Sequence, residues 1–211
     1  MLLAVAHGTR SAAGQAQIHD LVDRVACRRP DLDVRLAYVD VQQPRVADAI
    51  QGVEAVVVPL LLSTGYHVRV DIAEAVAAND AVATAPLGPD PVLVESLARR
   101  IGGADAVVLA AAGSSDPAWR ADIADVAAQL NAHVAYASGA ELRVPDVVAG
   151  LRAQGAQRIT IAAYLLAEGL FYRSLHRAGA DFVTPPLGQD PAIVDLVLAR
   201  YHDLTMASGR L

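Results

Sequence analysis

The chain has 211 residues, 54% of them hydrophobic, with 17 basic and 23 acidic side chains and a net charge of −6. This acidic balance argues against general affinity for nucleic acid. No apolar run reaches the roughly 18 uninterrupted residues of a membrane span. The single cysteine, Cys27, excludes an internal disulfide and a cysteine-ligated cluster, and the lack of lysine excludes Schiff-base chemistry.

Apolar strands alternate with amphipathic helices along the first half of the chain. Residues 1–6 have no basic region before them, so they are typical of a buried strand and not of a signal peptide. We therefore expect a cytoplasmic protein that binds no membrane. Further strands are expected at 34–39, from Val56 onward and at 81–85. The expected helices are one that carries Ile18, Leu21, Val22 and Val25, then 44–50, about 68–78, and one that carries Val94, Leu97, Ala98 and Ile101. This alternation predicts an α/β fold with a parallel sheet and helices on both faces.

The same pattern starts again after Gly102 and Gly103. Residues 107–115 repeat the first strand and its small-residue turn, a helix at 116–129 and a strand at 134–137 follow, and 159–163 repeat the third strand. The sequence Pro-Leu-Gly-x-Asp-Pro occurs at 86–91 and again at 186–191. We therefore predict a tandem duplication with two similar lobes, residues 1–103 and residues 104–211.

Three polar residues follow three successive strands of the first repeat: His7, Asp40 and His67. Because the carboxyl ends of parallel strands share one edge of a sheet, these side chains can converge in a crevice. Two imidazoles and a carboxylate can hold a divalent first-row metal, and imidazole also accepts protons near neutral pH. The second repeat has Ala112 opposite His7 and Phe171 opposite His67, so the fold does not depend on the histidines. Each residue also has a structural alternative: a surface or hydrogen-bonded histidine, or a helix cap for Asp40.

Three arginines follow the same strand ends: Arg10, Arg45 and Arg69. In an acidic protein they can form a local positive patch for a polyanionic ligand. The alternative is that they lie at solvated helix N-termini, where arginine is unfavourable for the helix dipole.

Several segments together resemble the sirohydrochlorin chelatases, the class II tetrapyrrole chelatases of sirohaem and cobalamin synthesis. They are Ala-Val-Ala-His-Gly-Thr-Arg at 4–10, Leu-Ala-Tyr-Val-Asp at 36–40, and the run from 57 to 72 that contains Ser-Thr-Gly-Tyr-His. The Pro-Leu-Gly-x-Asp-Pro turn of each half also fits this family, so the resemblance covers essentially the whole chain. It implies a chelatase-like fold with the tetrapyrrole in a cleft between two lobes.

The resemblance implies insertion of Fe²⁺ or Co²⁺ into sirohydrochlorin, with the metal as a substrate and no permanently bound cofactor. His7, His67 and Asp40 are then the catalytic and metal-binding residues; many family members carry glutamate at position 40, and aspartate is one methylene shorter. The rim carboxylates of the substrate would pair with Arg10, Arg45 and Arg69, helped by backbone N–H groups at Gly8, Thr9, Ser63 and Thr64. Shorter relatives dimerise to build two lobes, so the internal repeat predicts that this chain works as a monomer.

Two other functions compete with this hypothesis. A non-catalytic tetrapyrrole or metal carrier would use the same cleft for binding and release. A histidine phosphatase is suggested by His-Gly-Thr-Arg at 7–10, but those enzymes need an arginine before the His-Gly pair, and this chain has Ala6.

Overall fold

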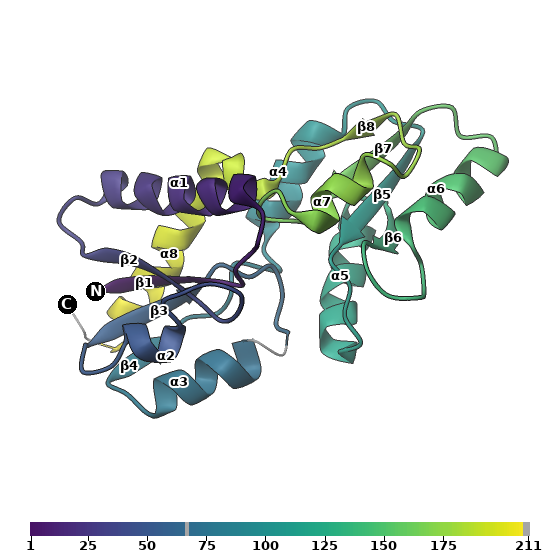
Figure 1. Cartoon of the computed structure of the whole chain (residues 1–211). Helices are drawn as coiled ribbons and strands as arrows, with labels where there is room; N and C mark the ends of the chain where they lie inside the picture. Colours follow the sequence, from purple (N-terminus) through teal and green to yellow (C-terminus); the bar gives the residue numbers. More distant parts are fainter. Residues whose placement is uncertain (66–67, 209–211) are drawn as a thin grey trace.

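The computed structural model describes residues 1–65 and 68–208, which form two parallel sheets of four strands each (Figure 1). The strand order is β2-β1-β3-β4 in the first sheet and β6-β5-β7-β8 in the second. The strands are β1 Leu2–Ala6, β2 Val34–Tyr38, β3 Ala55–Pro59, β4 Ala81–Ala83, β5 Ala106–Ala111, β6 His133–Tyr136, β7 Ile159–Ala163 and β8 Phe182–Val183. Each sheet reverses its strand order beside its first strand, and ligands of open α/β sheets bind at such a switch point.

Helices cover both faces of each sheet, as the sequence predicts. Their bounds are α1 Ala12–Arg28, α2 Val46–Ala49, a π-helical turn η1 at Val68–Ile72 that continues into α3 Ala73–Ala77, α4 Pro91–Ile101, α5 Pro117–Gln129, α6 Val144–Ala153, α7 Leu170–Leu175, a 3₁₀ turn η2 at Leu187–Gln189, and α8 Pro191–Ser208. Among the described residues, no helix combines the length and apolar character needed to cross a membrane. The α/β fold class with two helix-flanked parallel sheets is confirmed.

The strands are apolar on both faces because both faces are buried. In β1, Leu2, Ala4 and Ala6 belong to a large core that extends through both sheets, whereas Leu3 and Val5 face a separate core on the outer side of the first sheet. The outer face of the second sheet has its own core, with α6 and α7. The shared core explains why the two lobes are joined by apolar packing as well as by the chain.

The last helix of each repeat packs on the sheet of the other repeat. Helix α8 lies against β3 and α1 of the first half, and α4 lies against β7 of the second (Figure 1). The predicted lobes, residues 1–103 and 104–211, assign each last helix to the sheet of its own repeat. The repeated sequence shows where a helix begins, but it does not show which sheet the helix covers.

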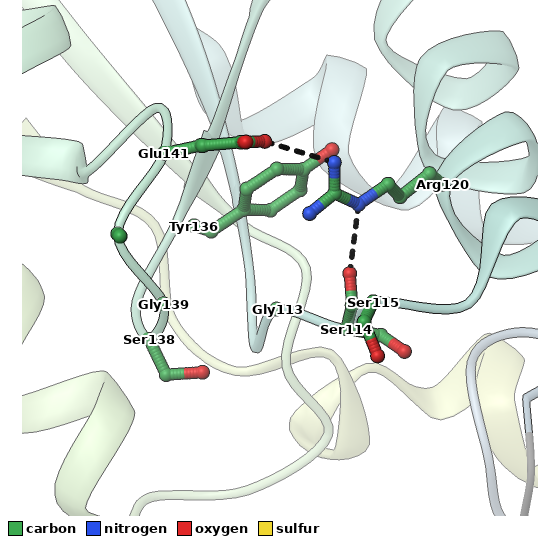
Figure 2. Close-up of a pocket in the computed structure, with 9 residues that line it drawn as sticks. Gly113, Ser114, Ser115, Arg120, Tyr136, Ser138, Gly139 and Glu141 are labelled. Atoms are coloured by element: carbon green, nitrogen blue, oxygen red, sulfur yellow. Dashed lines mark hydrogen bonds and ion pairs between the residues drawn. The ribbon is translucent and has the colours of Figure 1, made fainter.

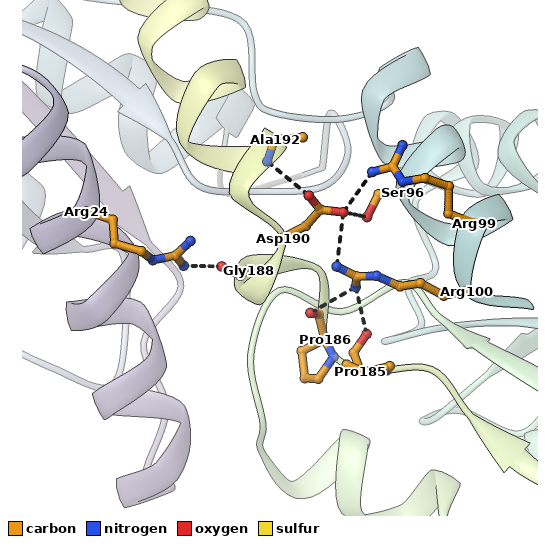
Figure 3. Close-up of polar contacts among 9 residues, drawn as sticks. All are labelled: Arg24, Ser96, Arg99, Arg100, Pro185, Pro186, Gly188, Asp190 and Ala192. Carbon is orange, nitrogen blue, oxygen red and sulfur yellow. Dashed lines mark hydrogen bonds and ion pairs between the residues drawn. The ribbon is translucent and has the colours of Figure 1, made fainter.

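Reciprocal arginine contacts hold the exchanged helices in place. Arg200 of α8 donates to Asp90 at 2.8 Å and to the carbonyls of Pro86 and Leu87, in the Pro-Leu-Gly-x-Asp-Pro turn of the first repeat. Arg100 of α4 contacts Asp190 at 3.0 Å and donates to the carbonyls of Pro185 and Pro186, at the start of the second turn (Figure 3). Both aspartates also accept a backbone N–H from the first turn of the helix that follows them. The repeated turn therefore caps one helix and binds the other.

Most strand positions agree with the sequence prediction, and the short elements differ. The helix expected at 44–50 is only four residues long, because residue 45 is extended and pairs with the end of β2, where the Tyr38 N–H donates to the Pro44 carbonyl. The strand expected at 81–85 ends at Ala83, and the helix expected at 68–78 opens as a π-helical turn. Helix α6 and strand β8 were not predicted.

Asp190 provides a test of the exchanged arrangement. Its side chain is 9% exposed and accepts from Ser96, Arg99 and Arg100 (Figure 3). Burial raises the pKa of Asp190, but the hydrogen bonds from Ser96 and Ala192 and the charges of Arg100 and Arg99 outweigh burial and lower it. We expect Asp190→Asn to lower the free energy of unfolding by about 3 kcal/mol, because the buried position loses the charge that pairs with the half-buried Arg100 and with Arg99.

The matched control is Asp195→Asn, on the helix that Asp190 caps. Asp195 is 61% exposed and pairs with Arg28, which is 57% exposed, so the expected loss is below about 1 kcal/mol. Because the folded-state pKa of Asp190 is lowered, its stabilisation is present above the unfolded carboxyl pKa and is lost as the pH falls through the folded value. Urea unfolding should therefore show the Asp190→Asn deficit at pH 7 and a smaller deficit below about pH 4. Equal deficits for the two variants would contradict this account.

Candidate active site

A cleft of about 610 Å³ lies where the switch points of the two sheets face each other. Its walls come from the segments after β1 and β3 in the first repeat and after β5 and β7 in the second. In sequence terms these are 6–9, 60–63 with 65, 112–114 and 164–172. Strand order alone places a ligand site at each of these points; the exchange of helices brings the two together into one cavity.

The first-repeat wall presents His7 on a turn that only glycine allows. His7 is exposed and lines the cleft, and its Nδ1 lies 3.2 Å from the Gly8 carbonyl oxygen. Gly8 has a φ of +94°, and a Cβ on it would lie 2.2 Å from the Asp40 carbonyl oxygen. The Asp40 N–H donates to the His7 carbonyl at 3.0 Å. The turns after β1 and β2 are thus bound together, which places Asp40 beside His7.

Asp40 is held as a carboxylate. The backbone N–H of Val41 lowers the pKa of Asp40 most, followed by the hydrogen bond from Arg45, and these effects exceed the opposing one of desolvation. The charge of His7 also contributes to the lower pKa. Arg45 donates to Asp40 at 3.1 Å and to the Val39 carbonyl at 2.6 Å. In this structure Arg45 therefore orients Asp40, whereas the sequence analysis assigned it to the substrate.

The segment after β3 has two different roles. Ser63 is buried and lines the cleft together with Gly65. Thr64 instead gives both its N–H and its hydroxyl to Asp122 of α5, each at 3.0 Å. The Thr64 N–H, which was predicted to bind the substrate, therefore joins the two lobes.

The remaining predicted residues are placed only in part. Gly8 and Thr9 line the cleft, and the Thr9 N–H donates to Gln42, which lines it as well. Arg10 is exposed just beyond them. His67 lies outside the described residues, as does the side chain of Arg69. Within residues 1–65 and 68–208, no group of three His, Cys, Asp or Glu side chains is close enough to hold a metal ion.

The second-repeat wall is mainly apolar and aromatic, and the sequence analysis did not identify it. Trp119, Tyr164, Leu170 and Phe171 line the cleft there. Leu170 is 68% exposed and Phe171 37%, which is unusual for such large apolar side chains. Burial raises the pKa of the Tyr164 hydroxyl, which donates to the Leu62 carbonyl across the cleft floor at 2.8 Å. The sequence signal on this side was Phe171 at the position equivalent to His67. It was interpreted as the loss of a histidine and not as part of an apolar cleft wall.

Equivalent contacts join the lobes on both sides of the cleft. Glu168 donates its N–H to Gln17 of α1 at 2.7 Å, and Gln17 donates back to the Glu168 carboxylate at 2.9 Å. Thr64 and Asp122 make the corresponding contact with the repeats reversed. Gly14 of α1 packs so closely on the Glu168 carbonyl that a Cβ would lie 2.0 Å from it. These contacts set the width of the cleft at its two strand-end walls.

Comparisons with known proteins agree with this architecture. The sirohydrochlorin cobaltochelatase of Methanosarcina barkeri is 26% identical over 77 residues, which are 34% of this chain and 59% of that protein's length. SirB from Bacillus subtilis with Fe³⁺ has a TM-score of 0.78 at 22% identity, covering 99% of this chain and 97% of that one. The sirohydrochlorin chelatase SirB from Bacillus subtilis subspecies spizizenii in complex with cobalt has a TM-score of 0.75 at 20% identity, covering the same shares of the two chains.

The family model named CbiX matches this chain twice in succession, over residues 1–104 and 106–204. The two matches together span nearly all of the sequence, and they follow the duplicated pattern of strands and turns described above. The chain therefore belongs to the CbiX family.

Proposed function

We propose that this chain inserts a divalent metal, Fe²⁺ or Co²⁺, into sirohydrochlorin for sirohaem or cobalamin biosynthesis. The observation that carries the proposal is His7 in a cleft between two repeats, next to the ionised Asp40, where the second repeat has Ala112. The family and the names of its similar members support the same activity. Both lobes of one chain complete the cleft, which supports a monomer as the working unit, and we expect it in the cytoplasm.

The chemistry needs a base and a nearby negative charge. The macrocycle loses two pyrrole N–H protons as the metal enters, so each turnover requires a proton acceptor close to the ring. A neutral His7 can deliver the metal or accept a proton, and we assign His67 the same kind of role. Asp40 stays ionised at neutral pH and stabilises the imidazolium of His7. Its pairing with Arg45 keeps the carboxylate in place without neutralising it by protonation.

The size and the lining of the cleft suit a largely apolar ring. A volume of about 610 Å³ lies within the usual range for small-molecule sites. Phe171 and Leu170 provide an exposed apolar surface on the second-repeat side. The first-repeat side has polar side chains at His7 and Ser63, whereas the Glu168 carboxylate on the second-repeat side accepts from Gln17. One wall would therefore cover the ring while the other carries out the reaction.

A non-catalytic tetrapyrrole or metal carrier remains the competing function, because it would need the same cleft. The two functions differ in turnover. With sirohydrochlorin and Co²⁺ both in large excess over protein, an enzyme forms many equivalents of metallated product, and the absorbance change continues at a rate proportional to protein concentration. A single equivalent of product would identify a carrier and contradict the proposal.

Substitution of the histidines tests their assignment. We expect His7→Ala and His67→Ala each to lower the rate of metal insertion about 100-fold or more, the usual contribution of a positioned acid or base. The absorbance change of sirohydrochlorin on metallation gives the rate. His133→Ala is the control, because His133 is exposed at the opposite end of its strand from the cleft. Wild-type rates in both the His7→Ala and the His67→Ala variants would exclude the assignment.

The close approach at Gly8 gives a second prediction. In Gly8→Ala, the positive φ alone costs about 1–2 kcal/mol, and the Cβ would collide with the Asp40 carbonyl. We expect the variant to lose both stability and activity, because the turns that hold His7 and Asp40 must separate. Gly52→Ala is the control: its φ is +68° but nothing lies within 4 Å of its Cβ position. A Gly8 variant that loses no more activity than the Gly52 variant would show that the turn does not position the site.

A further inference from the structure

A second cavity, of about 370 Å³, adjoins the cleft in the second repeat. Gly113 and Ser114 line both cavities. Trp119, which lines the cleft, packs on Tyr136, which lines the second cavity, with ring centroids 5.6 Å apart. A molecule in the cleft is therefore only one layer of side chains away from this second cavity.

Arg120 is the cation of this cavity (Figure 2). Its Nε donates to the Ser114 carbonyl at 2.8 Å, its Nη1 lies 3.0 Å from the Glu141 carboxylate, and its guanidinium carbon lies 5.7 Å from the centroid of the Tyr136 ring. Ser114 and Ser115 lie beside Arg120, and Ser138 lies across from it on the loop that carries Gly139 (Figure 2). A planar guanidinium fixed at one nitrogen and supported by an aromatic ring is well suited to a carboxylate.

The first repeat shows how much of this arrangement the fold requires. Gln15 stands at the position equivalent to Arg120, and its amide Nε2 donates to the Thr9 carbonyl at the same 2.8 Å. A neutral amide is thus sufficient to hold the loop. The fold therefore does not require the positive charge of Arg120 or its two Nη atoms.

The opposite loop also differs between the repeats. In the first, Gln42 fills the equivalent space and accepts from the Thr9 N–H at 2.9 Å. In the second, Gly139 and Ala140 replace Val41 and Gln42, and Ala140 has no side-chain oxygen with which to accept from the Ser114 N–H. The loss of these side chains opens the cavity in front of Arg120.

We propose that this cavity binds a rim carboxylate of the tetrapyrrole held in the cleft, with Arg120 as its partner. This inference rests on the proposed function. Among the described residues that line the cleft itself, none is an arginine, whereas the substrate is a polycarboxylate. Glu141 pairs with Arg120 in the free protein, and both side chains are well exposed, at 71% and 43%, so the pair is weak and a substrate carboxylate can replace it.

Arg120→Gln is the informative variant, because it introduces the residue that the first repeat already uses there. We expect KM for sirohydrochlorin to rise about tenfold with little change in kcat, the size expected for the loss of one charge-assisted contact. Arg120→Lys should recover part of the loss. Glu141→Gln removes the internal competitor and should lower KM. Arg28→Gln, at the far end of α1 and in a similarly exposed ion pair, should leave KM unchanged.

Direct binding of metal-free sirohydrochlorin, followed by its fluorescence, tests the Arg120 subsite separately from the proposed metal-insertion activity. If wild type binds the ring but shows no turnover, the proposed function fails and the subsite is still tested by the ratio of the two affinities. Equal binding by wild type and Arg120→Gln would overturn the subsite, as would an increase in KM for Glu141→Gln equal to that for Arg120→Gln. Citrate that competes with sirohydrochlorin in wild type but not in Arg120→Gln would show that both ligands place a carboxylate on Arg120, and it would support the subsite.

Discussion

Two reciprocal ion pairs, Arg200 with Asp90 and Arg100 with Asp190, hold the arrangement on which the site depends. Each pair joins a helix of one repeat to the turn of the other, and each aspartate also caps a helix. The exchange makes the two sheets share one core, so their switch points face each other across a single cavity. Separate lobes would each have a shallow crevice; the exchanged helices combine two crevices into a cleft that can enclose a macrocycle.

The scaffold is close to symmetric, and its chemistry is not. The contacts that join the lobes occur twice, as Thr64 with Asp122 and as Glu168 with Gln17. The polar residues at the strand ends differ: His7 and Asp40 in the first repeat correspond to Ala112 and Ser138 in the second. Duplication allows this difference, because the fold is satisfied by backbone contacts such as the approach of Gly8 to residue 40, which recurs between Gly113 and residue 138. The second repeat is free to supply an apolar wall and the Arg120 cavity.

The sequence was sufficient for the strands and their repeat, because buried parallel strands have a strong apolar signal. It also indicated that the turns of His7 and Asp40 lie together, because the carboxyl ends of the strands share an edge, and the Asp40 N–H does donate to the His7 carbonyl. The role of the two side chains stays a prediction. The sequence was not sufficient for the helix exchange, which depends on which sheet a helix covers. Arg45 and Thr64 also differ from expectation, since nothing local shows that Asp40 and Asp122 are their partners. The walls formed by Trp119 and Phe171 come from the other repeat, and short-range patterns carry no information about contacts of that range.

The central claim is that the metal binds at only one wall of the cleft, the first-repeat wall that carries His7, although the backbone of the cleft is nearly symmetric. Crystals of the wild-type protein soaked with Co²⁺ and measured at the cobalt absorption edge would test it most directly, since anomalous scattering locates the metal without assumptions about ligands. The account predicts a single cleft site within coordination distance of a His7 ring nitrogen, roughly 2.1 Å for first-row metal to imidazole. Cobalt beside Ala112 on the second-repeat wall, or equal sites on both walls, would contradict it.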